Sequence, residues 1–170
     1  MAPSNPKSFD LMRDALSEAQ MTVRAYDTKA QIVGVGYIFA LGIVMQIGDV
    51  LPVLEGNPLA VVFLSWAVVL FPIFHFGHVL YPTRKTAPKL SQDLNSTLKR
   101  VLYVEPERVD NVEDLRNAFT DCDPYDEYCY ELLKTSTLRE LKRKRFLRGL
   151  ISTTIAFLVL FLNHLFRGLA

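Results

Sequence analysis

The sequence of 170 residues contains only two cysteines and three histidines, two residue types that are common in catalytic and metal centres. Its two cysteines, Cys122 and Cys129, have no histidine nearby, and two thiols cannot complete a structural zinc site. The motifs G-x-S-x-G, H-E-x-x-H and C-x-x-C are absent, and so is the phosphate-binding P-loop. We therefore expect two ordinary reduced cysteines, no catalytic residue, no metal and no cofactor, in a protein that is not an enzyme.

Alternation of apolar and polar residues, which marks strands, is also missing beyond four residues, so the expected fold class is all-α. Charged residues are absent from three long runs, at residues 30–48, 56–83 and 149–166. Each run is close to or above the roughly 20 residues that a helix needs to cross a bilayer, where an unpaired backbone is not stable. We expect three transmembrane helices, the second shorter than its run because Pro58 and Pro82 bracket it.

The lysines and arginines are distributed unevenly around these runs. Four precede the first run, none lies in the loop DVLPVLEGN, and fourteen lie between residues 84 and 148. Because Lys and Arg remain on the cytoplasmic side, this distribution predicts a cytoplasmic N-terminus, a short external loop and an external C-terminus. Both charge signs occur before the first run, which does not fit a cleavable secretory signal.

The charged segments at both ends of the chain are predicted to be helical. Apolar residues between Phe9 and Tyr26 recur at steps of three and four, and the same stripe continues into the first run. We therefore expect one long helix over residues 8–48, whose stripe requires a partner helix or a second subunit. Asp123 and Pro124 supply a helix cap and a first-turn proline, which predicts a helix that continues unbroken into the third run.

Two further helices are predicted between the second and third runs. LSQDLNSTLKRVLY (residues 90–103) and NVEDLRNAF (residues 111–119) each carry an apolar stripe of helical spacing, and Pro106 separates them. The expected organisation is then a cytosolic amphipathic helix (1–29), two transmembrane helices (30–83) with an external loop (49–57), a cytosolic helical region (84–146) and a third transmembrane helix (147–170).

The stretch RAYDTKA places Arg24, Asp27 and Lys29 at the mouth of the first run. Arg24 and Asp27 are three positions apart and share a helix face, whereas Lys29 lies further round. One interpretation is an exposed turn with one weak ion pair, worth about a few tenths of a kcal/mol. The other is that Asp27 orients guanidinium and ammonium groups that together hold a phosphate. The residues alone leave both interpretations open.

Cations are also concentrated in LKRKRFLR, residues 141–148, directly before the third run. One interpretation is an anchor attracted to anionic lipid, at about 1 kcal/mol per cation. The other is a pocket for a small anion, shared with RAYDTKA. Because these cations lie against the membrane, lipid is a better partner for them than nucleic acid. His75 and His78 share a helix face and are interpreted as interfacial hydrogen-bonding residues rather than as a metal pair or proton relay.

Three segments resemble the membrane-type Pycsar effectors, which are small bacterial antiphage proteins. They are the D-x-K-A of RAYDTKA with an arginine three residues before the aspartate, LYPTRK after the second run, and YELLKTSTLRELKRKRFLR before the third. The resemblance covers about residues 15–150, and the matching positions are Arg24, Asp27, Lys29 and Ala30. It implies a sensor of cyclic CMP or cyclic UMP made by a partner cyclase, whose helices assemble or rearrange and damage the bacterial inner membrane in abortive infection.

Such a ligand offers one anionic phosphate, suited to arginine, and a pyrimidine face, suited to tyrosine. The candidate ligand-binding residues are therefore charged residues near the membrane, namely Arg24, Asp27, Lys29, Arg84, Lys85, Arg139 and Arg143. The candidates for base stacking are Tyr26, Tyr103 and Tyr128, with Tyr125 as a further possibility. A homo-oligomer is expected, because an anion at a subunit junction would relieve repulsion between like-charged helices.

Two other functions fit the same three apolar runs. A holin-like toxin would disrupt the membrane without a ligand, and would therefore kill cells on expression alone. A scaffold subunit of a larger membrane complex would use its amphipathic helices to bind a partner, which a pull-down would recover in stoichiometric amount without membrane leakage.

Overall fold

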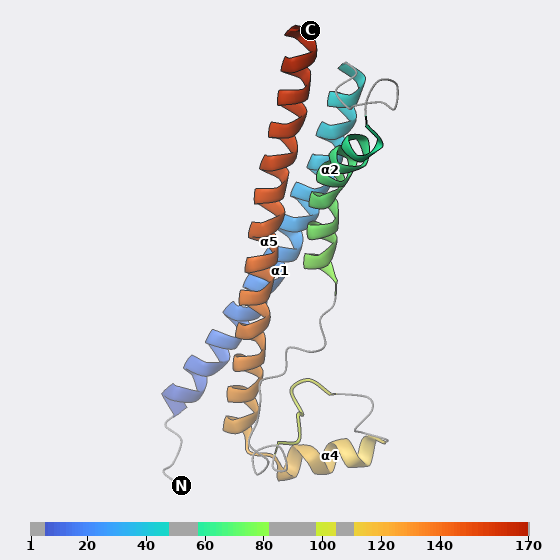
Figure 1. Cartoon of the computed structure of the whole chain (residues 1–170). Helices are drawn as coiled ribbons and strands as arrows, with labels where there is room; N and C mark the ends of the chain where they lie inside the picture. Colours follow the sequence, from blue (N-terminus) through green and yellow to red (C-terminus); the bar gives the residue numbers. More distant parts are fainter. Residues whose placement is uncertain (1–5, 48–57, 82–97, 105–110, 170) are drawn as a thin grey trace. The chain divides into compact units, whose positions relative to one another are not determined.

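The computed structural model describes residues 6–47, 58–81, 98–104 and 111–169, and within them all regular structure is helical (Figure 1). This confirms the all-α fold class. The helices are α1 (Pro6–Ile47), α2 (Leu59–Leu80), α4 (Val112–Asp121) and α5 (Pro124–Leu169).

Three of these helices contain segments long and apolar enough to cross a membrane: Lys7–Gln46, Leu59–Leu80 and Pro124–Phe166. The three predicted spans are thereby confirmed. The second helix begins directly after Pro58, and its C-cap is Tyr81, so it is shorter than its uncharged run, as the flanking prolines predicted.

The two long helices, α1 and α5, begin at or close to the positions that their capping residues predicted. Helix α1 is continuous over 42 residues and begins at Pro6, two residues before the predicted start. Helix α5 begins at Pro124, and the Asp123 carboxylate accepts a hydrogen bond from the Tyr125 N–H at 2.8 Å. Helix α5 then continues unbroken for 46 residues because no further proline interrupts it. Helix α4 is capped in the same way by Asn111, whose side chain accepts from the Asp114 N–H.

The prediction of a helix over residues 90–103 is wrong for residues 98–103, the part of this segment that the structure describes. Residues 98–104 contain a turn at 101–102 and a bend at 103 but no helix, and residues 90–97 lie outside the described part of the chain. Consecutive backbone N–H groups of this segment bond to the Glu127 carboxylate of α5 instead of to preceding carbonyls. Arg100 has a φ of 57°, in the left-handed region, which is incompatible with a right-handed helix.

The chain divides into two compact units. The first unit comprises Met1–Val23 and Thr83–Glu140, and the second comprises Arg24–Pro82 and Leu141–Ala170. The second unit therefore contains the apolar parts of α1 and α5 together with α2.

One core of the second unit forms around Tyr37, where residues of α1, α2 and α5 pack together. The Tyr37 hydroxyl donates a hydrogen bond to the Val69 carbonyl at 2.7 Å, which satisfies this polar group inside an apolar cluster. Its ring meets Phe157 edge-on, with the ring centroids 5.4 Å apart. The other buried members of this core are Leu41, Val69, Ala156 and Leu160.

A second core forms around Phe76 of α2, which is 2% exposed. A Cβ atom added at Gly34 of α1 would lie 3.3 Å from the Cβ of Phe76. A Cβ added at Gly149 of α5 would lie only 2.7 Å from Cε1 of the same ring. The Phe76 ring therefore occupies the space that two glycines leave open on the neighbouring helices.

Candidate functional site

The charged stretch RAYDTKA of α1 is joined to α5 by an ion pair. The Asp27 carboxylate contacts the Lys142 ammonium, and the Lys142 residue is only 6% exposed. Within the described residues, the ion pair of Asp27 is thus with a lysine of another helix and not with Arg24, one turn earlier on α1. The acid of this stretch serves to hold two helices together.

Aromatic rings from the same two helices pack together close to these residues in the sequence. The centroids of the Tyr26 and Phe146 rings are 6.0 Å apart, and those of the Phe146 and Phe76 rings are 6.2 Å apart. The Lys29 ammonium lies 5.8 Å from the centroid of the Tyr26 ring. We call Tyr26, Asp27, Lys29, Lys142 and Phe146 the interfacial cluster.

A neighbouring cation of α5 supports the end of α2. The Arg145 guanidinium donates a hydrogen bond to the His78 carbonyl at 3.0 Å. This carbonyl belongs to the last turn of α2, where backbone oxygens have no partner within the helix, so Arg145 acts as a C-terminal cap. The predicted histidine pair makes ring contacts: His75 meets Phe71 edge-on at 4.5 Å, and His78 stacks on Phe74 at 5.9 Å.

The structure brings together only part of the predicted ligand set. Tyr26, Asp27 and Lys29 lie in the interfacial cluster, and Arg24 and Arg143 are exposed residues of the same unit. Of the remaining candidates, Arg139, Tyr103 and Tyr128 belong to the first unit, and Arg84 and Lys85 lie outside the described residues.

Sequence reasoning missed Lys142, although a signal for it was present. Lys142, Phe146 and Gly149 follow one another at helical spacings of four and three, so they share the face of α5 that packs on α1 and α2. The three cations that follow Lys142, Arg143 to Arg145, obscured this periodicity.

A second polar cluster lies in the first unit, around Glu127 of α5. This side chain is 1% exposed, and its carboxylate accepts three backbone hydrogen bonds. The donors are the N–H groups of Lys99 at 2.6 Å, Arg100 at 2.8 Å and Val101 at 3.1 Å. Successive N–H groups around a left-handed residue form a concave nest suited to an anion, and here the anion is an internal side chain.

Two cations of the first unit lie over tyrosine rings. The Lys134 ammonium pairs with Glu131 at 3.0 Å and lies 4.4 Å from the centroid of the Tyr103 ring. The Arg100 guanidinium lies 5.4 Å from the centroid of Tyr130, a ring that is 3% exposed. Among the proposed stacking residues, Tyr103 thus has a cation over its exposed ring.

Tyr128, another proposed stacking residue, serves in packing. Its ring meets Phe9 of α1 edge-on, with the centroids 4.8 Å apart. Close by, the Cys129 thiol contacts the sulfur of Met12 at 3.5 Å. These contacts join α1 to α5 within the first unit, and they use the amphipathic stripe for which the sequence predicted a partner helix.

The two cysteines are free thiols of low reactivity. Burial raises the pKa of both thiols, and carboxylates nearby raise it further: Glu127 for Cys122, and Asp126 for Cys129. At neutral pH both groups are therefore protonated, which makes them poor nucleophiles and poor metal ligands. Within the described residues there is also no group of three or more potential metal ligands.

Comparison with protein families shows which family the chain belongs to. Residues 11–167 match the family PycTM, described as the Pycsar effector protein domain. The chain belongs to this family. No curated protein and no solved structure matches the chain. The resemblance predicted from RAYDTKA is thus confirmed, and the match is longer than the predicted 15–150.

Family membership and the three apolar helices make the chain a membrane protein and an effector of an antiphage cyclic-nucleotide pathway. A Pycsar effector implies a cyclic nucleotide supplied by a partner cyclase. The family is not a known class of enzymes.

Proposed function

We propose that this effector binds a cyclic pyrimidine mononucleotide, cyclic CMP or cyclic UMP, and in response rearranges its membrane helices to impair the bacterial inner membrane. The N-terminus lies in the cytosol, where the partner cyclase releases the ligand, and the C-terminus lies outside. The observation that carries the proposal is the interfacial cluster, in which RAYDTKA, the most specific part of the family resemblance, is joined to the cationic segment of α5.

The charges of this cluster favour an anion. Asp27 is engaged by Lys142, so it does not neutralise Arg24 and Lys29, which are both exposed on α1. Lys29 and Lys142 of the cluster, together with Arg24 one turn before Asp27 on α1, are three cations against a single carboxylate. A cyclic phosphate carries one negative charge and accepts hydrogen bonds from ammonium and guanidinium groups, which form the stronger, charge-assisted kind. The partly exposed Tyr26 ring offers a face for the pyrimidine.

The same ion pair gives a route from ligand binding to helix movement. A phosphate that binds Lys142 competes with Asp27, and the ion pair between α1 and α5 weakens as a result. A ligand shifts a conformational equilibrium only by its difference in affinity for the two states, and a change from about 1:99 to 99:1 requires about 5.5 kcal/mol. Assembly of copies around the bound anion would supply part of this difference. Arg139, Tyr103 and Tyr128 remain predicted ligand contacts.

Calorimetry of the purified full-length protein tests ligand binding. We expect binding of cyclic CMP or cyclic UMP, and none of cyclic AMP or cyclic GMP. The double substitution Arg24→Ala and Lys29→Ala should weaken binding by about a hundredfold, because two charged hydrogen-bond donors are lost. Arg13→Ala is the matched control, since Arg13 is an exposed cation of the same helix that lies outside the cluster. Unchanged affinity in the double variant would overturn the assignment of the site.

Dye leakage from liposomes that carry the protein tests the response. Leakage should begin only when the cognate nucleotide is added. Leakage without any nucleotide would favour the holin-like toxin, and a stoichiometric protein partner without leakage would favour the scaffold subunit.

A further inference from the structure

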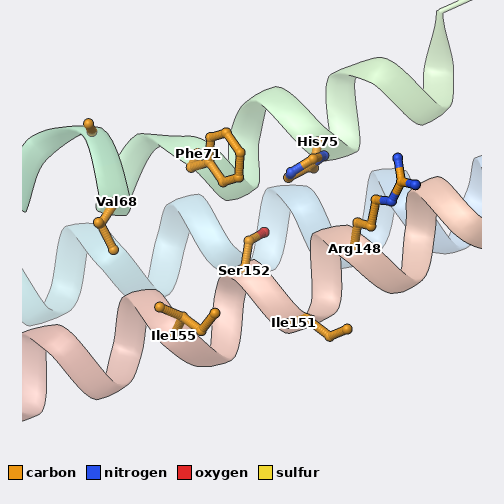
Figure 2. Close-up of a pocket in the computed structure, with 8 residues that line it drawn as sticks. Val68, Phe71, His75, Arg148, Ile151, Ser152 and Ile155 are labelled. Carbon is orange, nitrogen blue, oxygen red and sulfur yellow. The ribbon is translucent and has the colours of Figure 1, made fainter.

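A groove of about 390 Å³ runs between α2 and α5 in the second unit. Figure 2 shows its walls: Phe71 and Val68 come from α2, whereas Ile151 and Ile155 come from α5. These positions belong to the apolar spans of the two helices, so the groove lies at the depth of the hydrocarbon. Its volume is within the range of sites that bind small molecules, roughly 300–1,000 Å³.

The two ends of the groove differ in chemistry. His75 and Arg148 lie at the same end, and Val68 and Ile155 lie towards the other (Figure 2). Arg148 directly precedes the third uncharged run, so this end of the groove is at the level of the lipid headgroups. No acidic residue is among those described that line the groove. The polar end is therefore positive and suited to a phosphate, which a guanidinium binds through two parallel hydrogen bonds.

The floor of the groove offers no polar group to a ligand. Ser152 is the one hydroxyl residue among its described lining residues, and its hydroxyl donates to the Gly149 carbonyl at 2.8 Å. Because this donor is already used within α5, the surface between the two ends behaves as an apolar one. A ligand that fits must be apolar along its length and anionic at one end.

A second copy of the chain fits the groove less well than a lipid does. Copies in one membrane share the same orientation, so Lys144, Arg145 and Arg148 of the second copy would lie at the depth of the positive end. Like charges placed together across an interface oppose association. An anionic headgroup at that position is attracted instead.

We propose that this groove is a binding site for an anionic phospholipid. One acyl chain lies along Phe71, Ile151 and Ile155, and the headgroup phosphate binds the Arg148 guanidinium beside the His75 ring. This site is distinct from the interfacial cluster, since none of the five residues of that cluster lines the groove.

Native mass spectrometry of the full-length protein in detergent tests the proposal. The probes are phosphatidylglycerol, phosphatidylethanolamine and soluble glycerol phosphate. We expect a phosphatidylglycerol adduct that survives activation, little retention of phosphatidylethanolamine, and no displacement by glycerol phosphate. Arg148→Gln should reduce the retained phosphatidylglycerol about tenfold, the effect of losing one charged hydrogen-bonding partner.

Ile155→Phe tests the apolar part of the groove and leaves the charge in place. Ile155 is 49% exposed, so a larger ring there fills the groove without disturbing a buried core. We expect Ile155→Phe also to lose the phosphatidylglycerol adduct. The control Lys144→Gln removes an exposed cation that lies one turn before Arg148 on α5, and it should retain the adduct. Circular dichroism checks that each variant is folded.

Three results would overturn the lipid site. The first is retention of phosphatidylglycerol in both folded groove variants. The second is displacement of the lipid by glycerol phosphate, which would reduce the site to a simple anion site. The third is a dimer that forms when lipid is removed and that does not form in the Ile155→Phe variant. This result would show that a second copy of the chain, and not a lipid, binds in the groove.

Discussion

At the scale of single residues, two carboxylates of the described chain each join segments that are far apart in sequence. Glu127 binds the backbone of a turn 26 to 28 residues earlier, and Asp27 binds Lys142, 115 residues later. A buried or half-buried charge is stable only when partners replace the water that it loses. Each carboxylate therefore depends on its partners, and the partner segments depend on the carboxylate.

Replacing Glu127 with glutamine should loosen the turn at Lys99–Val101. The amide has the same shape but only one acceptor oxygen: if this oxygen takes the place of Oε1, which accepts from Lys99 and Arg100, the NH₂ group faces the Val101 N–H. We expect a loss of about 1–3 kcal/mol of local stability, typical of buried polar groups left without partners. Hydrogen exchange of the three amides measures this loss directly.

The control for this substitution is Glu113→Gln, at an exposed position in the first turn of α4. Exchange at the Lys99, Arg100 and Val101 amides should be unaffected by it. Wild-type protection of those amides in the Glu127 variant would show that the carboxylate does not hold the turn.

Replacing Lys142 with methionine should destabilise the second unit, because it leaves the Asp27 carboxylate without its cation in a partly buried place. A hydrogen bond between charged groups contributes about 1.5–3 kcal/mol, and thermal unfolding in detergent should show a loss of this order. Lys144→Met serves as the control, since Lys144 is exposed on the same helix. The double variant Asp27→Asn with Lys142→Met should recover part of the loss, since removing both charges costs less than removing one. Equal melting of all four proteins would contradict this account.

At the scale of secondary-structure elements, the helices are set by local features and could be predicted. Uncharged runs of sufficient length gave the three spans, and the caps at Asn111 and Asp123 gave the starts of α4 and α5. The turn at 98–104 could not be predicted in this way. Its apolar residues have helical spacing, but its backbone bonds to Glu127 on another element, and local periodicity contains no trace of that contact.

The candidate site, too, could be predicted only where local features of the sequence define it. RAYDTKA could be identified as a candidate site because its charges lie directly before an uncharged run long enough to cross a membrane. The partner of Asp27 could not be identified, because the sequence does not distinguish among the several cations of LKRKRFLR as its ion-pair partner. Only the packing face of α5, which contains Phe146 and Gly149, distinguishes Lys142 from its neighbours.

Substitution of Gly149 by alanine tests how closely α5 packs on α2. Its Cβ would lie 2.7 Å from the buried Phe76 ring, so we expect a loss of about 1–3 kcal/mol, typical of overpacked cores. Gly36→Ala is the matched change, because no atom lies within 4 Å of the new Cβ. That variant should gain up to about 1 kcal/mol from helix propensity.

Thermal unfolding in detergent measures both glycine variants. Adding Phe76→Leu to the Gly149 variant should restore part of its stability by making room for the new methyl group. If Gly149→Ala melts at or above the wild-type temperature, the helices are not in close contact at this point.

At the scale of the whole molecule, the family match covers both compact units and all three apolar helices. The sensing and the membrane response that we propose therefore belong to one continuous domain. The orientation of that domain in the membrane is a prediction from the distribution of lysine and arginine, and the proposed site meets a cytosolic ligand only in that orientation.

Reporter fusions test this orientation. Alkaline phosphatase, which is active only outside the cytosol, should be active when fused after Ala170 and inactive when fused within residues 84–97. A fluorescent protein that folds only in the cytosol should give the opposite pattern and serves as the control. Active phosphatase at the internal position would place the cationic segments outside and would separate the proposed site from the cytosolic ligand.

The Phe76 ring, inserted between Gly34 and Gly149, has a consequence for how such a domain can switch. A ring fitted into recesses on two neighbouring helices cannot slide along either of them by small increments, since the residues one turn away on the same faces carry Cβ atoms: Ala30 and Ile38 on α1, and Arg145 and Thr153 on α5. The helices can change register only by withdrawing the ring completely and seating it elsewhere. Activation should accordingly be abrupt in each molecule, so that graded ligand doses change how many molecules have switched and not how far each has moved.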